Sequence, residues 1–405
     1  MSVRRQAAAD PLGSYDFVAP PRILFGAGRI GEIGGVAADL GTEAWLVAGR
    51  RSRTACGGWE AITGAIEAAG LPCRLVAEAA GEPTVAQVAA ALDAVRVPSG
   101  ARPVMVAVGG GATIDFAKAL AALATNAQVG DDPESAVLDH LEGVGRGLAI
   151  RTPPLPLVAV PTTAGTGAEA TRNAVLSCPV RRFKKSIRSP LMVPRAAFVD
   201  PALAVSCDRR TTAASGLDCI TQLIESFICR FRRPLPRALV LEALPRAIAA
   251  LPRVLAAPAD LDARAAMGHA ALVSGMALTN SGLGLAHGVA AALGVECDVP
   301  HGVACAVLLP VALRANRQAA VADLALLERA VDPAASDADP AAADAFLARV
   351  AALCDAAGTP RRLRDTGLRR DRIAWLAENS GGASMRGNPV EVAPDMLRRL
   401  LEEAY

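Results

Sequence analysis

A short stretch, GLDCITQLIE at residues 216–225, contains two side chains that are candidates for holding a metal ion. Asp218 and Gln222 are four residues apart, so on a helix both face the same way. A carboxylate followed four residues later by a histidine would give a helix two metal ligands on one face. Here the second residue is a glutamine. The stretch therefore raises the question whether this helix holds a metal ion at all.

Two of the four histidines in the chain lie close together, in LAHGVAAALGVECDVPHGVACAVLLP at 285–310. His287 fits a helix, and His301 follows a proline, so it begins the next helix or a turn. A lone histidine on an apolar face is usually a core residue. Two of them, with Asp218 available elsewhere, suggest a site of two imidazoles and one carboxylate. That donor set suits Fe(II) or Zn(II).

A glycine turn follows an apolar strand in VAVGGGATIDFAKAL, residues 106–120. Gly109, Gly110 and Gly111 would let backbone amides approach a pyrophosphate, whose charge the next helix N-terminus favours. The spacing is not G-x-G-x-x-G, and a tight turn explains three glycines about as well; the flanking strand and helix favour phosphate. The loop VPTTAGTGAEATRNAVL, 160–176, offers hydroxyls and glycines for a nucleotide, although ordinary loops share that composition.

These residues must be positioned by two kinds of structure. Up to about residue 200, apolar runs alternate with helical stretches, which predicts a mainly parallel sheet covered on both faces. The predicted strands are 22–25, 44–48, 73–77, 103–108, 155–160 and 196–200. Beyond about residue 202 every segment has helical periodicity. We therefore predict an α/β nucleotide-binding domain over 1–201 and an all-α domain over 202–405, with the active site in the cleft between them.

Composition and charge narrow the class of protein. The chain has 405 residues, 52% of them hydrophobic, which suffices for two or three domains. Its 42 basic and 40 acidic residues give a net charge of +2, so nucleic-acid binding is not expected. The nine cysteines are scattered, and the first residues contain no apolar signal segment. We expect reduced thiols in a cytoplasmic protein without a membrane span.

Several blocks together resemble the iron-containing (group III) alcohol dehydrogenase family, which belongs with the dehydroquinate synthase-like fold. The blocks run in order over nearly the whole chain: ILFGAG, GEPT, GGGATIDFAK, PTTAGTGAEAT, KSIRSPLMVPRAAFVDP, GLDCITQLIE, GLAHG, PHGVACAVLLP and GNP. The resemblance implies a Rossmann-like domain that binds NAD or NADP. It also implies hydride transfer between nicotinamide and a small alcohol, aldehyde or ketone, assisted by a metal, and homodimers are common in the family.

The resemblance assigns the cofactor site to the glycine turn and the hydroxyl-rich loop. The implied residues are Gly109, Gly110, Gly111, Asp115, Thr162, Thr163, Thr166 and Lys184. Many members have an aspartate after the strand at 44–48, which accepts the ribose 2′-hydroxyl and repels a 2′-phosphate. This chain instead has Gly49 followed by Arg50, Arg51 and Arg53. We expect it to accept NADP; a solvated arginine loop is the alternative.

The resemblance also implies the metal ligands Asp218, His287 and His301, with Gln222 where the family has its first histidine. A glutamine oxygen can coordinate a hard cation, but less strongly than an imidazole, so the substitution weakens the site without erasing it. Maleylacetate reductases in the same family also vary here. Cys219 and Cys297 are expected near the site as small buried residues.

Three functions remain open from the sequence. The first is a metal-assisted NAD(P)-dependent alcohol dehydrogenase or carbonyl reductase. The second is a metal-independent reductase of an unsaturated keto acid, with Arg172, Lys185 and Arg188 available for the carboxylates. The third is a catalytically inactive nucleotide-binding relative, which nucleotide binding without turnover would reveal.

Overall fold

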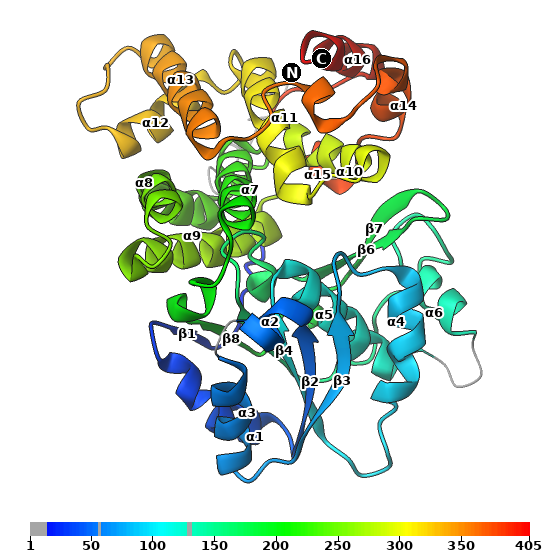
Figure 1. Ribbon diagram of the computed structural model, residues 1–405. Coiled ribbons are helices and arrows are strands. Elements are labelled where there is room, and N and C mark those ends of the chain that lie inside the picture. The colour runs from blue at the N-terminus through cyan, green and yellow to red at the C-terminus, as the bar shows by residue number, and fades with distance from the viewer. Residues whose placement is uncertain (1–13, 56–57, 128–131) are drawn as a thin grey trace, which may run out of the picture.

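The computed structural model describes residues 14–55, 58–127 and 132–405, which form a sheet-bearing half and a helical half (Figure 1). Every strand pair in the main sheet is parallel, and the strand order is β1-β8-β5-β4-β2-β3. The strands are β1 (Ile23–Phe25), β2 (Glu43–Gly49), β3 (Cys73–Ala79), β4 (Pro103–Gly109), β5 (Leu157–Pro161) and β8 (Ala196–Val199). The six predicted strands and the α/β class are confirmed.

Alternation along the strands explains why helices cover both faces of this sheet. In β4, Met105 and Ala107 pack in one cluster and Val104 and Val106 in another, because successive side chains point to opposite faces. The first cluster includes residues of α4 (Val85–Ala91), α5 (Gly111–Asn126) and α6 (Pro133–Asp139), and the second includes residues of α1 (Ile33–Leu40) and α3 (Trp59–Ala68). Every residue of β4 is buried, as expected for a central parallel strand.

An antiparallel hairpin, β6 (Asn173–Cys178) and β7 (Phe183–Arg188), was not predicted from the sequence. Its strands alternate between buried and partly exposed residues and include Lys184 and Lys185, so they lack the continuous apolar run that marked the other strands. Beside the hairpin turn, Arg182 forms an ion pair with Glu296 of the helical half. The hairpin therefore joins the two halves.

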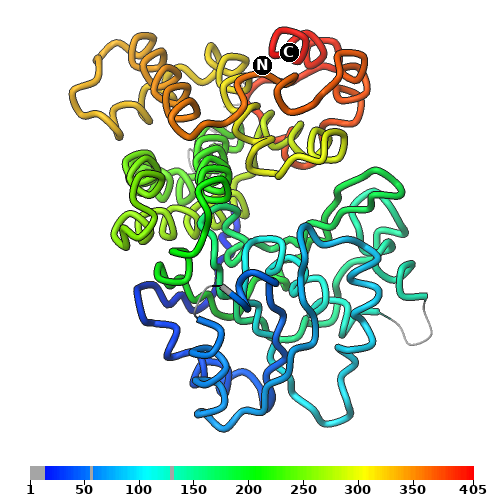
Figure 2. The backbone as a smooth tube through the Cα atoms, in the orientation of Figure 1, coloured from blue at the N-terminus to red at the C-terminus, as the bar shows by residue number. Residues whose placement is uncertain are grey.

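Only helices follow β8 in the part of the chain that the structure describes, as predicted. They are α7 (Arg209–Ile228), α8 (Pro234–Ala256), α9 (Leu261–Asn280), α10 (Leu285–Cys297), α11 (His301–Asn316), α12 (Val321–Val331), α13 (Asp339–Ala357), α14 (Ile373–Glu378), α15 (Gly382–Met385) and α16 (Pro394–Glu403). The trace runs through the sheet-bearing half first and then through the helical half (Figure 2). None of the described helices is both long and apolar enough to cross a bilayer.

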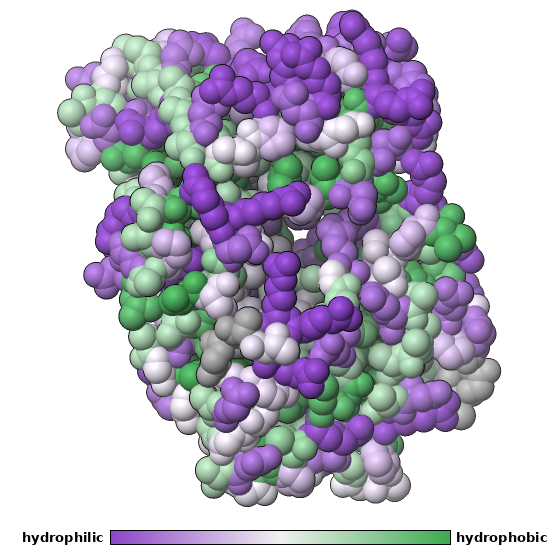
Figure 3. Space-filling model, viewed as in Figure 1, coloured by the Kyte–Doolittle hydropathy of each residue, from purple (hydrophilic) through white to green (hydrophobic). Residues whose placement is uncertain are grey.

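The site lies where the halves face each other. The carboxyl ends of β2, β4 and β5 are neighbours in the sheet and point toward the helical half (Figure 1). The surface between the halves is hollowed and rimmed by hydrophilic side chains (Figure 3). Ligands of open parallel sheets bind beyond these strand ends, so this hollow is the place to look for the site.

Candidate active site

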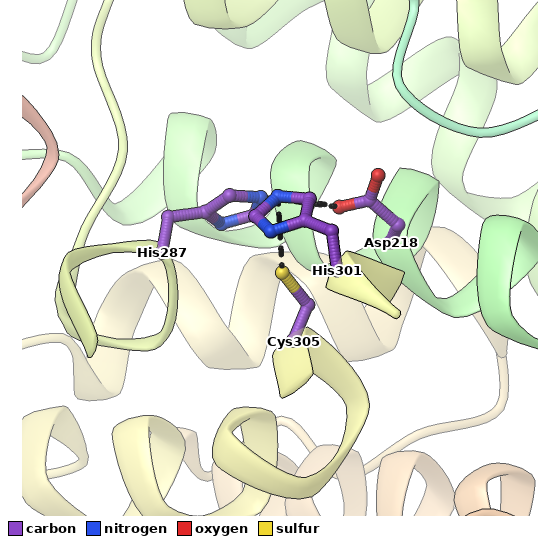
Figure 4. A group of neighbouring side chains, drawn as sticks. All are labelled: Asp218, His287, His301 and Cys305. Atoms are coloured by element: carbon purple, nitrogen blue, oxygen red, sulfur yellow. Dashed lines mark hydrogen bonds and ion pairs between the residues drawn. The ribbon is translucent and has the colours of Figure 1, made fainter. Parts of the chain in front are cut away.

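Four side chains from three helices converge on one point: Asp218 of α7, His287 of α10, and His301 and Cys305 of α11 (Figure 4). One ligand atom of each lies within 4.8 Å of those of the others. The Asp218 Oδ1 atom is 3.2 Å from His287 Nε2 and 3.9 Å from His301 Nε2. Cys305 Sγ is 3.6 Å from His301 Nε2. The structure thus brings together three of the four metal ligands that the resemblance implied.

The helices are held so that these side chains meet. Asp208 caps the N-terminus of α7 by accepting a hydrogen bond from the Thr211 amide, and α7 is buried over most of its length. Asp298, in the left-handed region at φ 52°, ends α10, and Pro300 begins α11. His301 is therefore the first residue of α11, as the sequence analysis allowed.

Glu225, on the same helix as Asp218, was not singled out from the sequence. Its Oε2 atom is 2.8 Å from His287 Nδ1. The two Glu225 oxygens also accept hydrogen bonds from the backbone amides of Ala286 and His287 at the start of α10. A carboxylate in this position fixes the tautomer and direction of the imidazole, as carboxylates commonly do behind metal-bound histidines. Its spacing of seven residues, two turns after Asp218, was the available signal.

The pKa shifts of the group show that its environment favours positive charge. Burial works against the charged form of His287, but Cys305, Asp218 and Glu225 outweigh it and raise the pKa of His287 well above its ordinary value. Burial also opposes the Asp218 carboxylate, yet its histidine neighbours lower the pKa of Asp218. The group therefore favours a positive charge at its centre, which a divalent cation would supply.

The donor set fits such a cation. Burial and the positive charge of Lys184 lower the pKa of His301 to about 4, which keeps this imidazole neutral as a metal ligand requires. With Glu225 holding His287 Nδ1, the His287 Nε2 atom faces the centre of the group. Two imidazoles, a carboxylate and a thiol are a familiar donor set for Zn(II), and imidazoles with a carboxylate suit Fe(II).

Gln222 lies one turn after Asp218 on α7, as predicted, and is buried; its Oε1 atom accepts a hydrogen bond of 2.8 Å from Ser274 of α9. Cys305, one turn after His301, adds a thiol to the group. The sequence analysis considered Cys219 and Cys297 and overlooked this thiol. The signal was the spacing of four residues between His301 and Cys305 on one helix face.

The predicted cofactor residues at the strand ends come together. The Thr162 amide donates to the Gly109 oxygen at 3.0 Å, so the hydroxyl-rich loop is anchored beside the glycine turn. A Cβ on Gly110 would lie 3.2 Å from Thr163 Oγ1, and one on Gly111 only 2.3 Å from Thr166 Oγ1. Gly111 is the first residue of α5, so the turn and the N-terminus of that helix form one backbone cradle suited to an anion.

Two further predicted cofactor residues, Asp115 and Lys184, lie deeper than the glycine turn or to its side. Asp115 accepts a hydrogen bond from the Val175 amide and lies 3.6 Å from the Lys118 ammonium, which ties α5 to the hairpin. Burial raises the pKa of Asp115. Lys184 of β7 forms an ion pair with Glu82 at 2.5 Å. Among the described residues, neither side chain forms a hydrogen bond with the glycine turn.

The arginines after β2 begin the short helix α2 (Arg50–Ala55). Gly49 ends the strand, and a Cβ there would lie 2.9 Å from Thr113 Oγ1, so a glycine keeps this strand end close to α5. Arg50 is 3.4 Å from Glu78 and has a side chain that is 70% exposed. Its guanidinium is therefore weakly held and can reach a ligand at this edge.

Comparison with known proteins agrees with this geometry. Residues 20–201 match the iron-containing alcohol dehydrogenase family and residues 212–405 match the C-terminal part of the Fe-containing alcohol dehydrogenase family. The lactaldehyde reductase of Escherichia coli K12 is 31% identical over 383 residues, which are 94% of this chain and 97% of that protein. The alcohol dehydrogenase 4 of Saccharomyces cerevisiae YJM789 is 30% identical over 391 residues, 96% of this chain and 98% of that one.

A solved structure of 1,3-propanediol oxidoreductase, 28% identical, superposes with a TM-score of 0.89 over 97% of this chain and 100% of its own. A structure of sulfoacetaldehyde reductase from Bifidobacterium kashiwanohense in complex with NAD+, also 28% identical, superposes with a TM-score of 0.83 over 97% of this chain and 99% of its own. The resemblance found in the sequence is confirmed: the chain belongs to the iron-containing alcohol dehydrogenase family.

Proposed function

We propose that this enzyme transfers a hydride reversibly between a nicotinamide cofactor and a small alcohol, aldehyde or ketone. The observation that carries the proposal is the convergence of Asp218, His287, His301 and Cys305 on one point (Figure 4), in the helical half toward which the strand ends are directed (Figure 1). A group of metal donors beside a nucleotide cradle fits the chemistry of an NAD(P)-dependent, metal-assisted alcohol dehydrogenase. Family membership supports the same reaction.

Asp218, His287 and His301 are the proposed holders of Fe(II) or Zn(II), with Cys305 in the fourth place and Gln222 behind them. When bound, such a cation acts as a Lewis acid on the substrate oxygen. Glu225 holds the His287 imidazole in one tautomer through its Nδ1 atom. Burial of the Asp218 and His287 side chains, from α7 and α10, excludes water from one side of the reacting oxygen.

The cofactor proposal is NAD or NADP at the carboxyl ends of β2, β4 and β5. Gly109, Gly110 and Gly111 would take the pyrophosphate on backbone amides, and Thr162, Thr163 and Thr166 would contact the nucleotide from the neighbouring loop. Asp115 and Lys184 are proposed to act from the side of the hairpin. The similarity to a sulfoacetaldehyde reductase solved in complex with NAD+ supports NAD as the cofactor.

The remaining assignments are also proposals. We divide the chain into a dinucleotide-binding domain over 1–201 and a helical metal and substrate domain over 202–405, which agrees with the two matched family segments. We expect the enzyme to work in the cytoplasm on small molecules, and to form a homodimer.

One measurement tests the metal part of the proposal first. Elemental analysis of protein purified without chelator or oxygen should find close to one iron or zinc per chain. Removal of that metal should abolish aldehyde reduction, and readdition of Fe(II) or Zn(II) should restore it. A metal-free protein that still reduces carbonyl compounds would contradict this arrangement.

That outcome would favour a second function, a metal-independent reductase of an unsaturated keto acid. The raised pKa of His287 supports it, because a protonated imidazole can polarise a carbonyl by hydrogen bonding. Nucleotide binding with no turnover of any alcohol or carbonyl compound would instead indicate an inactive relative.

A further inference from the structure

A cavity of about 410 Å³ opens between the segment before β1, the hairpin and the helical half. It is lined by parts of the chain that are far apart in sequence, including Asp16, Arg172, Phe231, Leu278 and Ala383. Two of its arginines, Arg172 and Arg188, were considered above for substrate carboxylates, but the proposed metal and cofactor sites use none of its residues. Its volume is that of a small-molecule site.

The lining carries more positive than negative charge. Four arginines contribute to it, Arg172, Arg188, Arg233 and Arg386, against the two carboxylates of Asp16 and Glu142. Glu142 forms an ion pair with Arg188 at 2.9 Å, and Arg233 donates to the Ser14 carbonyl at 2.7 Å. Arg172 and Arg386 have no carboxylate partner among the residues that the structure describes. The cavity therefore has a cationic wall that is not neutralised from within.

Among the residues that line the cavity, Arg172 most clearly lacks a binding partner. Its Nε atom is buried and has no hydrogen-bond partner in the described part of the chain. A buried donor without a partner destabilises the protein, and more so when the group is charged. Burial and the nearby Arg188 lower the pKa of Arg172, which again indicates a positive charge without enough compensation. An anion in the cavity would accept a hydrogen bond from Arg172 Nε and would also balance the positive charge of this side chain.

The cavity is built partly from elements that also contact the metal-ligand group. Leu278 lies one turn after Ser274 on α9, and Ser274 contacts Gln222. On the other side, Ala383 belongs to α15, whose Met385 packs against Gly288, the residue after His287. Two lining residues are thus two residues or one helical turn along the chain from residues that contact the candidate site.

We propose that this cavity binds the anionic end of the substrate, which is then a short aldehyde or ketone bearing a carboxylate, sulfonate or phosphonate. The inference rests on the proposed function and narrows it. The guanidinium groups of Arg172 and Arg386 present planar pairs of N–H donors that match an oxyanion. The carbonyl end of the same molecule then lies toward Asp218, His287 and His301.

The test compares substrates that differ in one charged group. Steady-state reduction is measured with succinic semialdehyde and with butyraldehyde, which has the same four-carbon chain and no charge. Sulfoacetaldehyde and phosphonoacetaldehyde are measured beside acetaldehyde, to tell the three oxyanions apart. We expect kcat/KM to be about 10- to 100-fold higher for the best anionic substrate than for its neutral partner, the worth of one or two charge-assisted hydrogen bonds.

Variants locate the effect in the cavity. Arg172→Gln and Arg386→Gln should each raise KM for the anionic substrate about 10-fold or more with little change in kcat, and leave the neutral substrate unchanged. Arg398→Gln is the matched control, because Arg398 lies on α16, pairs with Glu402 and is not part of the cavity. It should alter neither substrate.

Three results would overturn the inference. Equal kcat/KM for charged and neutral aldehydes would contradict the anionic subsite but leave the proposed function intact. An equal loss of kcat/KM on both substrates in Arg172→Gln would have the same meaning. Failure to reduce any aldehyde with NADH or NADPH would remove the proposed function, and this inference with it.

Discussion

At the scale of single residues, the thiol of Cys305 beside the candidate metal ligands bears most on the chemistry. The glutamine at 222 suggests a weakened site, but the thiol of Cys305 lies among Asp218, His287 and His301. Burial raises the pKa of Cys305 to about 12, so this thiol ionises only if a cation takes up its charge. A thiolate would also move the preference of the site from Fe(II) toward Zn(II).

Reconstitution with Co(II) tests directly whether Cys305 is a metal ligand. Protein reconstituted with Co(II) should show the strong near-ultraviolet absorption of a thiolate–cobalt bond, and Cys305→Ser should lose it while still binding the metal. Gln222→Ala is the control and should keep the band. Cobalt that binds to the unaltered protein without this absorption would exclude Cys305 as a ligand and leave the metal proposal intact.

Glu169, beside the hydroxyl-rich loop, gives the protein a pH-dependent stability. Burial raises the pKa of this carboxyl to about 7, from an ordinary value of 4.5. The folded state therefore holds the proton more tightly than the unfolded state. The contribution of this proton to the free energy of unfolding is fully present below pH 4.5 and is lost as the pH rises to about 7. The contribution is about 3 kcal/mol at most.

Urea unfolding of the unaltered protein and of Glu169→Gln across pH 4.5–8 measures this contribution. The free energy of unfolding of the unaltered protein should fall relative to that of the variant over this range. Parallel curves would mean that Glu169 is ionised in the folded protein at neutral pH, with Lys118 as its partner.

Arg50 is expected to decide the tolerance for a 2′-phosphate. Its side chain is mostly exposed and contacts only Glu78 by an ion pair, so it can turn to the ribose of a bound cofactor. Arg50→Ala should lower kcat/KM for NADPH about 10-fold and change that for NADH little. Comparison of the two cofactors in both proteins checks this, and a strong NADH preference in the unaltered protein would contradict it.

At the scale of elements, the helical half meets the cofactor loop backbone to backbone. A Cβ on Gly275 of α9 would lie 2.1 Å from the Gly167 carbonyl oxygen, so α9 can approach the loop only with a glycine at this position. Gly167 itself has φ 61° and a Cβ there would lie 2.4 Å from the Ala271 oxygen. This contact fixes the distance between the loop that carries Thr162 and the helix that touches Gln222.

Gly275→Ala should therefore separate α9 from the loop. We expect a loss of stability of about 1–3 kcal/mol from overpacking and a raised KM for the cofactor. Gly64→Ala, on α3, is the matched control, because nothing lies within 4 Å of the added methyl group. The control should be neutral or slightly stabilising, since alanine is the better helix former. Thermal unfolding and cofactor titration of both variants would separate these effects.

The elements were predictable where one physical signal was strong. Apolar runs such as that of β4 can only be buried strands, and the periodicity after residue 202 can only be helical. The hairpin β6–β7 was missed because β6 is buried only at alternate residues and β7 carries charged, mostly unburied residues, so neither is a continuous apolar run. Cys305 and Glu225 were missed because the packing of α7, α10 and α11, which brings them together, depends on side chains far apart in sequence.

At the scale of the whole molecule, β1 is the terminal strand at one edge of the sheet. Among the described residues it pairs with β8 alone, and it exposes Ile23 and Phe25, 38% and 36% accessible. An open edge with exposed apolar residues invites pairing with another chain. The resemblance to the family suggested a homodimer, and we propose this edge as the surface where a second copy of the chain would pair.

The opposite edge supplies the comparison. Strand β3 is also terminal, and its Leu75 is 40% exposed. Sedimentation equilibrium should give the unaltered protein twice the 41.4 kDa mass of one chain. Ile23→Lys should shift it to the monomer mass by placing a desolvated charge at the interface, whereas Leu75→Lys should leave the dimer intact. A monomeric unaltered protein would rule the dimer out, and dissociation by Leu75→Lys alone would place the interface at β3.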